Sequence, residues 1–183
     1  MNAQGGRYSN ALNASVSRDH TEISRLLLDK GADVNAQAQS GYGDPLQAAA
    51  SIGHTDIARI LLDKGADVNS QGGTYGNALQ AASIGSLDDL DHYIDESHRL
   101  KLQKRAGEDA QRHDGNALQA ASGGHTDMVK LLLDKGADVN LQGGYYGNAL
   151  QSASHKGNLE IVKSLLDKGA DVNAQGGHHG TAL

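Results

Sequence analysis

The chain has 183 residues, no cysteine and a formal net charge of −6. The lack of cysteine excludes disulfides, thiolate metal sites and a thiol nucleophile, and it favours an intracellular, cytoplasmic location. The acidic balance argues against nucleic-acid binding, which relies on cationic contacts to phosphates, and the apolar runs are too short for a membrane span or a signal peptide. Phe and Trp are absent, so the core must be built from Leu, Ile, Val and Ala.

A nine-residue string, LLDKGADVN, occurs four times, and its copies start at Leu27, Leu61, Leu132 and Leu165. A second string, GNALQ or a close variant, precedes the copies. Repetition at this period is typical of stacked arrays, in which each unit buries its apolar face against its neighbours. We therefore expect one array whose third unit is divergent and carries an insertion. Its units are about 5–37, 38–71, 72–110, 111–142 and 143–175, with a partial unit at 176–183.

The first helix of each unit is predicted to begin at a residue whose side chain can cap free N–H groups. These predicted caps are Asn10, Asp44, Asn77, Asn116, Asn148 and Thr181. Pro45 follows Asp44 at the first-turn position, where a missing N–H costs nothing. The helix is short and rich in alanine, which favours close approach of neighbouring backbones.

The second helix of each complete unit except the divergent third is predicted to open with an acidic first turn and to close with Lys-Gly, both of which suit the helix dipole and a left-handed C-terminal cap. The acidic residues are Glu22, Asp56, Asp127 and Glu160. The closing pairs are Lys30–Gly31, Lys64–Gly65, Lys135–Gly136 and Lys168–Gly169. Segments rich in Gly, Asn and Gln follow, and they predict hairpin-like loops.

Two helices and a projecting loop in about 33 residues resemble the ankyrin repeat over nearly the whole chain. The motif GADVN and the pairs Gly53–His54 and Gly124–His125 carry the resemblance. It implies an all-α fold, an ankyrin-repeat solenoid of helix-turn-helix units. The family's T-P-L-H block reads N-A-L-Q at Asn77–Gln80, a variant similar to arrays of fungal proteins. In the family the Thr and His hydrogen-bond between adjacent loops, and Asn or Asp and Gln could replace them here.

Polar residues that recur in the units are interpreted as scaffold, since every unit needs folding and stacking. They are the serines Ser83, Ser122 and Ser154, the aspartates Asp33, Asp67, Asp138 and Asp171, and the histidines His20, His54 and His125. For the histidines we expect hydrogen bonds at helix starts. Because no base or orienting partner accompanies the serines and aspartates, we predict no catalytic residue, no cofactor site and no metal site.

Residues that vary between units are the candidates for partner binding. A loop set precedes the first helices and consists of Arg7, Tyr8, Tyr42, Tyr75, His113, Asp114, Tyr145 and Tyr146. A groove set follows them and consists of Arg18, Ile52, His155 and Lys156. The resemblance implies that the groove set faces a concave groove beside the loops. Tyrosines suit protein interfaces, but packing of each tyrosine on the next loop is an equal alternative.

The third unit carries Asp88, His92 and Asp95 on one predicted helical face, followed by a basic run from Arg99 to Arg105. We interpret both as solvated parts of an extended helix. A metal-dependent enzyme centred on this unit is the alternative from a different class.

The function predicted is a non-enzymatic scaffold that binds a partner protein through the loop edge and the groove, and no nucleic acid or membrane. A spacer or regulatory segment of a larger protein, similar to fungal sensors in which such arrays follow a nucleotide-binding domain, is the alternative. Neither end carries a polar cap, so we expect exposed apolar surface on the last complete unit, end-to-end self-association, and a segment of a longer array.

Overall fold

The computed structural model describes residues 10–38, 43–73, 75–84, 125–144 and 146–176, and all structural statements concern these ranges. Their secondary structure is helical, apart from two isolated bridges that join Gly72 to Gly76 and Gly143 to Gly147. The helices are α1 (Ala11–Val16), α2 (Thr21–Asp29), α3 (Pro45–Ile52), α4 (Thr55–Asp63), α5 (Ala78–Ile84), α8 (Thr126–Asp134), α9 (Ala149–Lys156) and α10 (Leu159–Asp167). The all-α fold class is therefore confirmed.

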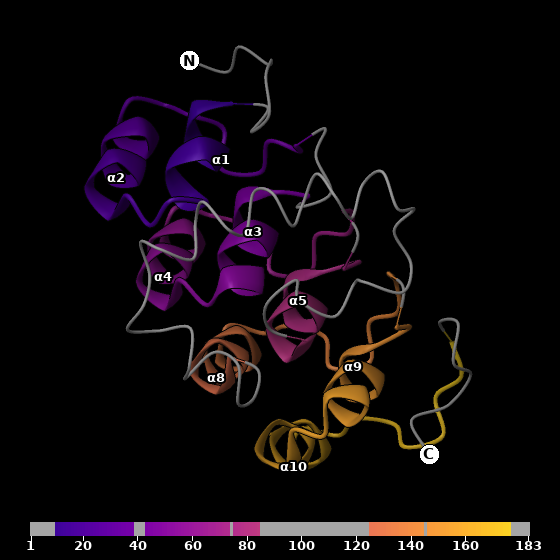
Figure 1. Cartoon of the computed structure of the whole chain (residues 1–183). Coiled ribbons are helices and arrows are strands. Elements are labelled where there is room, and N and C mark those ends of the chain that lie inside the picture. The colour runs from indigo at the N-terminus through magenta and orange to yellow at the C-terminus, as the bar shows by residue number, and fades with distance from the viewer. Residues whose placement is uncertain (1–9, 39–42, 74, 85–124, 145, 177–183) are drawn as a thin grey trace, which may run out of the picture.

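The helices form two rows (Figure 1). The row of first helices contains α1, α3, α5 and α9, and the row of second helices contains α2, α4, α8 and α10. The hairpin segments that precede α5 and α9 extend beyond the first-helix row, on the side away from the second helices. This is the layered order of a solenoid, in which contacts run within a unit and between neighbouring units.

The predicted helix signals are confirmed wherever the structure describes them. The caps Asn10, Asp44, Asn77 and Asn148 each accept a hydrogen bond from the backbone N–H three residues later, at 2.8 to 2.9 Å. Pro45 is the first residue of α3. The second helices end at lysine caps followed by glycines with φ between +85° and +89°, namely Gly31, Gly65, Gly136 and Gly169. The caps predicted at Asn116 and Thr181 lie outside the described residues.

The pairing of α5 with α8 differs from the units expected from the sequence. The backbone N–H of His125, before α8, donates to Ala82 O in α5 at 3.1 Å. The same bond joins α4 to α3, from His54 to Ala49 at 2.9 Å. Helix α8 therefore stands to α5 as α4 stands to α3, and the described helices form four pairs.

The physical reason for this difference lies in a duplicated string. Residues 76–83 and 115–122 are both GNALQAAS, so the sequence offers α8 two identical first helices. We expected α5 in the divergent unit 72–110 and α8 in the unit 111–142. Asp88, His92, Asp95 and the basic run Arg99–Arg105 lie outside the described residues.

The core runs as a thin strip along the stack, between the two rows. Its largest fully buried side chains include Leu46, Ile57, Leu61, Leu79 and Met128. Alanines fill the contacts between successive first helices, where the small side chain lets the backbones approach closely. Among the helices of the described ranges, none combines the length and apolar character that crossing a bilayer requires.

Candidate functional site

A buried glutamine in each of three first helices ties that helix to a loop. Gln47 Nε2 donates to Ser70 O at 3.1 Å, and Gln151 Nε2 donates to Gly176 O at 3.0 Å. Gln80 Nε2 reaches Gly147 O at 2.7 Å and Leu141 O at 3.3 Å. These bonds join each first helix to the loop that follows its unit. The glutamine of the N-A-L-Q block therefore bonds to the adjacent loops, as expected for a replacement of the family's histidine.

The recurring aspartates and asparagines of GADVN hold the loops in the same way. Each of Asp33, Asp67, Asp138 and Asp171 accepts a hydrogen bond from the backbone N–H of the asparagine two residues later, at 2.9 or 3.0 Å. Asn69 then bridges to the next unit: its Nδ2 donates to Gly136 O at 3.3 Å and its Oδ1 accepts from the N–H of Asp138 at 2.7 Å. These side chains serve the scaffold.

Ser83 behaves as predicted, Ser154 is partly buried and Ser122 lies outside the described residues, but the prediction for the histidines is wrong. Ser83 is buried, and its Oγ donates to Leu79 O at 2.7 Å within α5. The side chains of His20, His54 and His125 precede second helices without capping them. Two of these rings instead contact the neighbouring unit, at Asp19 just after α1 and at Ser51 near the end of α3.

These two histidine contacts cross between neighbouring units. His54 Nδ1 lies 3.4 Å from Asp19 Oδ1. His125 Nε2 lies 3.3 Å from Ser51 O, and burial lowers the pKa of the His125 imidazole. A partly buried ring beside a backbone carbonyl fills space and adds a polar contact. His54 and His125 thus belong to the stacking interface.

The loop tyrosines are buried in the described part of the chain. Tyr75 is 3% exposed and Tyr146 is 5% exposed. The Tyr146 ring lies against the His155 ring, with centroids 5.0 Å apart and planes tilted by 42°. The structure thereby brings one member of the loop set together with one member of the groove set. Such burial favours packing, the alternative role considered for these rings. The other members of the loop set, Arg7, Tyr8, Tyr42, His113, Asp114 and Tyr145, lie outside the described residues.

The groove set lies at the ends of the first helices and reaches the surface. His155 is exposed, and Arg18, Ile52 and Lys156 are partly buried. Arg18, Ile52 and Lys156 each stand eight residues after the cap of their own first helix. One structural position therefore carries an arginine, an isoleucine and a lysine in three of the four described units, and its equivalent in the unit of α5 and α8 lies outside the described residues. This variation at equivalent, accessible positions distinguishes the groove set from the recurring scaffold residues.

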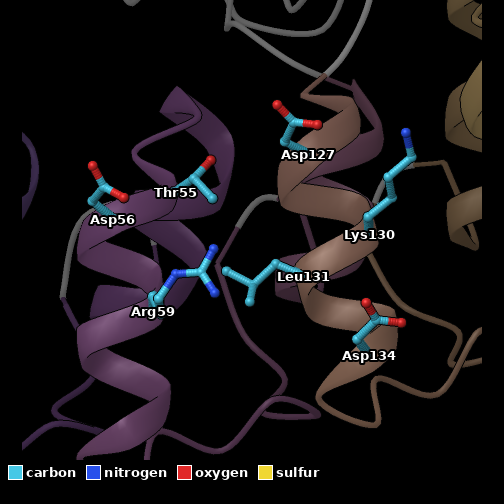
Figure 2. Close-up of a pocket in the computed structure, with 7 residues that line it drawn as sticks. All are labelled: Thr55, Asp56, Arg59, Asp127, Lys130, Leu131 and Asp134. Carbon is cyan, nitrogen blue, oxygen red and sulfur yellow. The ribbon is translucent and has the colours of Figure 1, made fainter.

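Sequence reasoning missed a polar groove of about 450 Å³ between the second helices α4 and α8 (Figure 2). Arg59 and Leu131 point toward each other across it. Two of its charges are already held by the next unit, because Lys130 Nζ donates to Glu160 at 2.9 Å and Asp134 accepts from Lys168 at 3.3 Å. The groove is thus the seam between two successive units, with acidic and basic groups alternating along it. The sequence signal for this groove was the cation at the fifth position of each second helix.

Comparison with family models identifies the class of protein. The model described as ankyrin repeats (3 copies) matches residues 1–72 and 78–176. The chain therefore belongs to the ankyrin-repeat family. No curated protein matches it. Ankyrin repeats generally mediate protein–protein interaction and are typically non-enzymatic binding modules.

Proposed function

We propose that this chain is a scaffold that binds a partner protein through the groove set and the adjoining loop edge. The observation that carries the proposal is the division of polar residues into two classes. The side chains that recur form helix caps, loop turns and hydrogen bonds between units. Side chains that vary at equivalent positions reach the surface at the ends of the first helices. A surface that differs along its length suits recognition of one particular protein more than a uniform polymer.

Within this site, we assign different roles to the exposed and the buried members. Ile52, Lys156 and the exposed His155 supply contacts of different chemistry to the partner, as does Arg18. Tyr75 and Tyr146 are too deeply buried to offer much surface, and they support the loop edge. The Tyr146 ring backs His155 and limits its rotamers, which lowers the entropy lost when a partner contacts it.

The test begins with capture of proteins from the native source on the tagged chain, followed by affinity measurements with the partner that is identified. Ile52→Ala and Lys156→Ala are expected to raise the Kd about tenfold or more each, as for central interface residues. Arg59→Ala is the matched control, because Arg59 is an exposed side chain on the second-helix row. It is expected to leave the Kd unchanged.

A raised Kd in Arg59→Ala, with an unchanged Kd in Ile52→Ala and Lys156→Ala, would assign binding to the α4–α8 groove and refute the proposal. Thermal unfolding of all three variants separates lost contacts from lost folding. If capture with the intact chain returns no specific partner, the spacer or regulatory reading replaces the scaffold reading.

A further inference from the structure

Successive units are joined by an ion pair at the ends of the second helices. Lys64 Nζ donates to Asp29 at 2.7 Å, Lys135 to Asp63 at 2.9 Å, and Lys168 to Asp134 at 3.3 Å. In every case the capping lysine of one unit reaches back to the last aspartate of the unit before. Continuing this pattern leaves one donor, Lys30, and one acceptor, Asp167, each without such a partner among the described residues.

The loop asparagines also join successive units, always in the same direction along the stack. Asn35, Asn69 and Asn140 donate from Nδ2 to the C-terminal glycine carbonyl of the next unit's second helix, Gly65, Gly136 and Gly169 respectively, at 3.1 to 3.4 Å. By this register, Asn173 of the last described unit offers the same amide. At the other end of the stack, Gly31 offers the equivalent carbonyl.

Apolar side chains that are buried between units inside the stack are exposed at its two ends. The third position of the second helix is 0% exposed at Ile57, Met128 and Ile161 but 49% exposed at Ile23. Ile23 differs from these three residues because no described unit precedes its helix. The side chain at this position is therefore buried by the preceding unit where one is present. Leu26, on the same helix, is 57% exposed.

The opposite end of the stack shows the matching face. The eighth position of the second helix is 8% exposed at Leu28 and Leu133 and partly buried at Leu62, but it is 40% exposed at Leu166, which has no described unit after it. Leu159 and Val172 of the same unit are 63% and 41% exposed. Exposed apolar surface on the last complete unit was expected from the sequence, and these fractions confirm it.

We propose that these two end faces bind each other between copies of this chain, head to tail. The first face presents Ile23, Leu26 and Lys30, and the last face presents Leu166, Asp167 and Asn173. Together they contain the apolar, ionic and amide partners that join units inside the stack. A second copy is the occupant because it carries both the opposite charge and the matching amide–carbonyl register.

This contact is heterologous, so it leaves one free face at each end of a pair and allows growth into open chains of copies. Exposed ion pairs contribute little by themselves, so the apolar side chains supply most of the affinity and the ion pair sets the register. The inference concerns the ends of the stack and does not depend on the proposed partner site along the groove set.

The test is sedimentation velocity of the whole chain over a range of concentrations. Ile23→Asp blocks the first face and Leu166→Asp blocks the last face, and both residues are at least 40% exposed, so folding should survive. The wild-type chain is expected to form larger species as concentration rises, and each blocked variant is expected to stay monomeric. An equal mixture of the two variants is expected to form a 1:1 dimer, since each retains the face that the other lacks.

Arg59→Ala is the control, because Arg59 is an exposed side chain in the middle of the second-helix row and belongs to neither end face. It is expected to associate like the wild type. A charge series leaves the apolar contacts intact: Lys30→Glu should weaken association by roughly twofold to fivefold, and adding Asp167→Lys to the same chain should restore it.

A wild-type chain that remains monomeric up to about 1 mM overturns the proposal and assigns the faces to another occupant. Self-association of either blocked variant alone also overturns it, because that result requires a contact other than head to tail. Loss of association in Arg59→Ala would place the contact on the second-helix row and would overturn it as well.

Discussion

The close contact between successive loops is testable at Gly76 with a control at Gly65. Gly76 has φ +90° and Gly65 has φ +89°, so alanine meets the same left-handed backbone at both positions. The surroundings differ. A Cβ on Gly65 would have no neighbour within 4 Å, whereas a Cβ on Gly76 would overlap Gln80 Oε1 and the backbone of Gly143 and Gly144. The pair therefore separates backbone strain from loop contact.

The expected magnitudes follow from these environments. Gly65→Ala should lower the free energy of unfolding by roughly 1–2 kcal/mol, the cost of the left-handed conformation for a residue with a Cβ. Gly76→Ala carries the same cost and must also push the loops apart. That movement strains the bonds from Gln80 Nε2 to Gly147 O and Leu141 O, and an unsatisfied buried group costs about 1–3 kcal/mol. We expect the loss of unfolding free energy in Gly76→Ala to exceed that in Gly65→Ala by roughly 1–3 kcal/mol.

Urea unfolding followed by circular dichroism at the helix band measures both values. Because stability in a stack depends on interfaces between neighbours, Gly76→Ala should also broaden the transition as the two sides of the stack uncouple. Equal losses in the two variants would show that the loops are not in contact at this point, and the reasoning about loop-to-loop bonding would be wrong.

Three further predictions concern buried polar groups. Burial raises the pKa of the Asp44 carboxyl above its ordinary 3.8, so the folded state loses stability as pH rises from 3.8 through the raised value and the carboxyl ionises. Asp44→Asn should therefore increase the unfolding free energy at neutral pH by about 1 kcal/mol. This gain should disappear in acid, where the Asp44 carboxyl is protonated. Burial lowers the pKa of His125 below its ordinary 6.5, so the contribution of this histidine to the unfolding free energy should be lost as pH falls from 6.5 through the lowered value. His125→Asn, which introduces the residue found at the equivalent position Asn158, should make the unfolding free energy less dependent on pH in that range. Gln80→Ala should cost about 0.5–1.5 kcal/mol in urea unfolding, the net contribution of a hydrogen bond, because the Gly147 carbonyl loses the Gln80 amide but still accepts from the N–H of Gly143. No measurable loss would contradict the contribution of that bond.

The helices were predictable because their signals are local. A cap such as Asn148 and an ending such as Lys168–Gly169 act within one turn of helix, so the sequence window that specifies them is short. The same holds for the ankyrin fold, which follows from many repetitions of those signals. Local chemistry also predicted that recurring serines and aspartates serve the scaffold.

Other features depended on contacts between units, and the sequence did not determine them. Two identical GNALQAAS strings precede α8, so no local signal states which string pairs with it. His125 looked like a helix-start residue, yet its bond goes to Ser51 O in another unit. The burial of Tyr75 likewise depends on how closely the loops approach, a distance that periodicity does not specify.

The position of each side chain relative to its helix cap explains how the stack separates stability from recognition. Three residues after the cap, the side chain is an amide in every described unit, namely Asn13, Gln47, Gln80 and Gln151, and each donates to the loop that follows. Eight residues after the cap, the side chain is Arg18, Ile52 or Lys156. The first position must supply a donor to a backbone carbonyl, so its chemistry is fixed by the neighbouring unit. The second position has no such uniform requirement, so its chemistry is free to follow a partner while the stack stays intact.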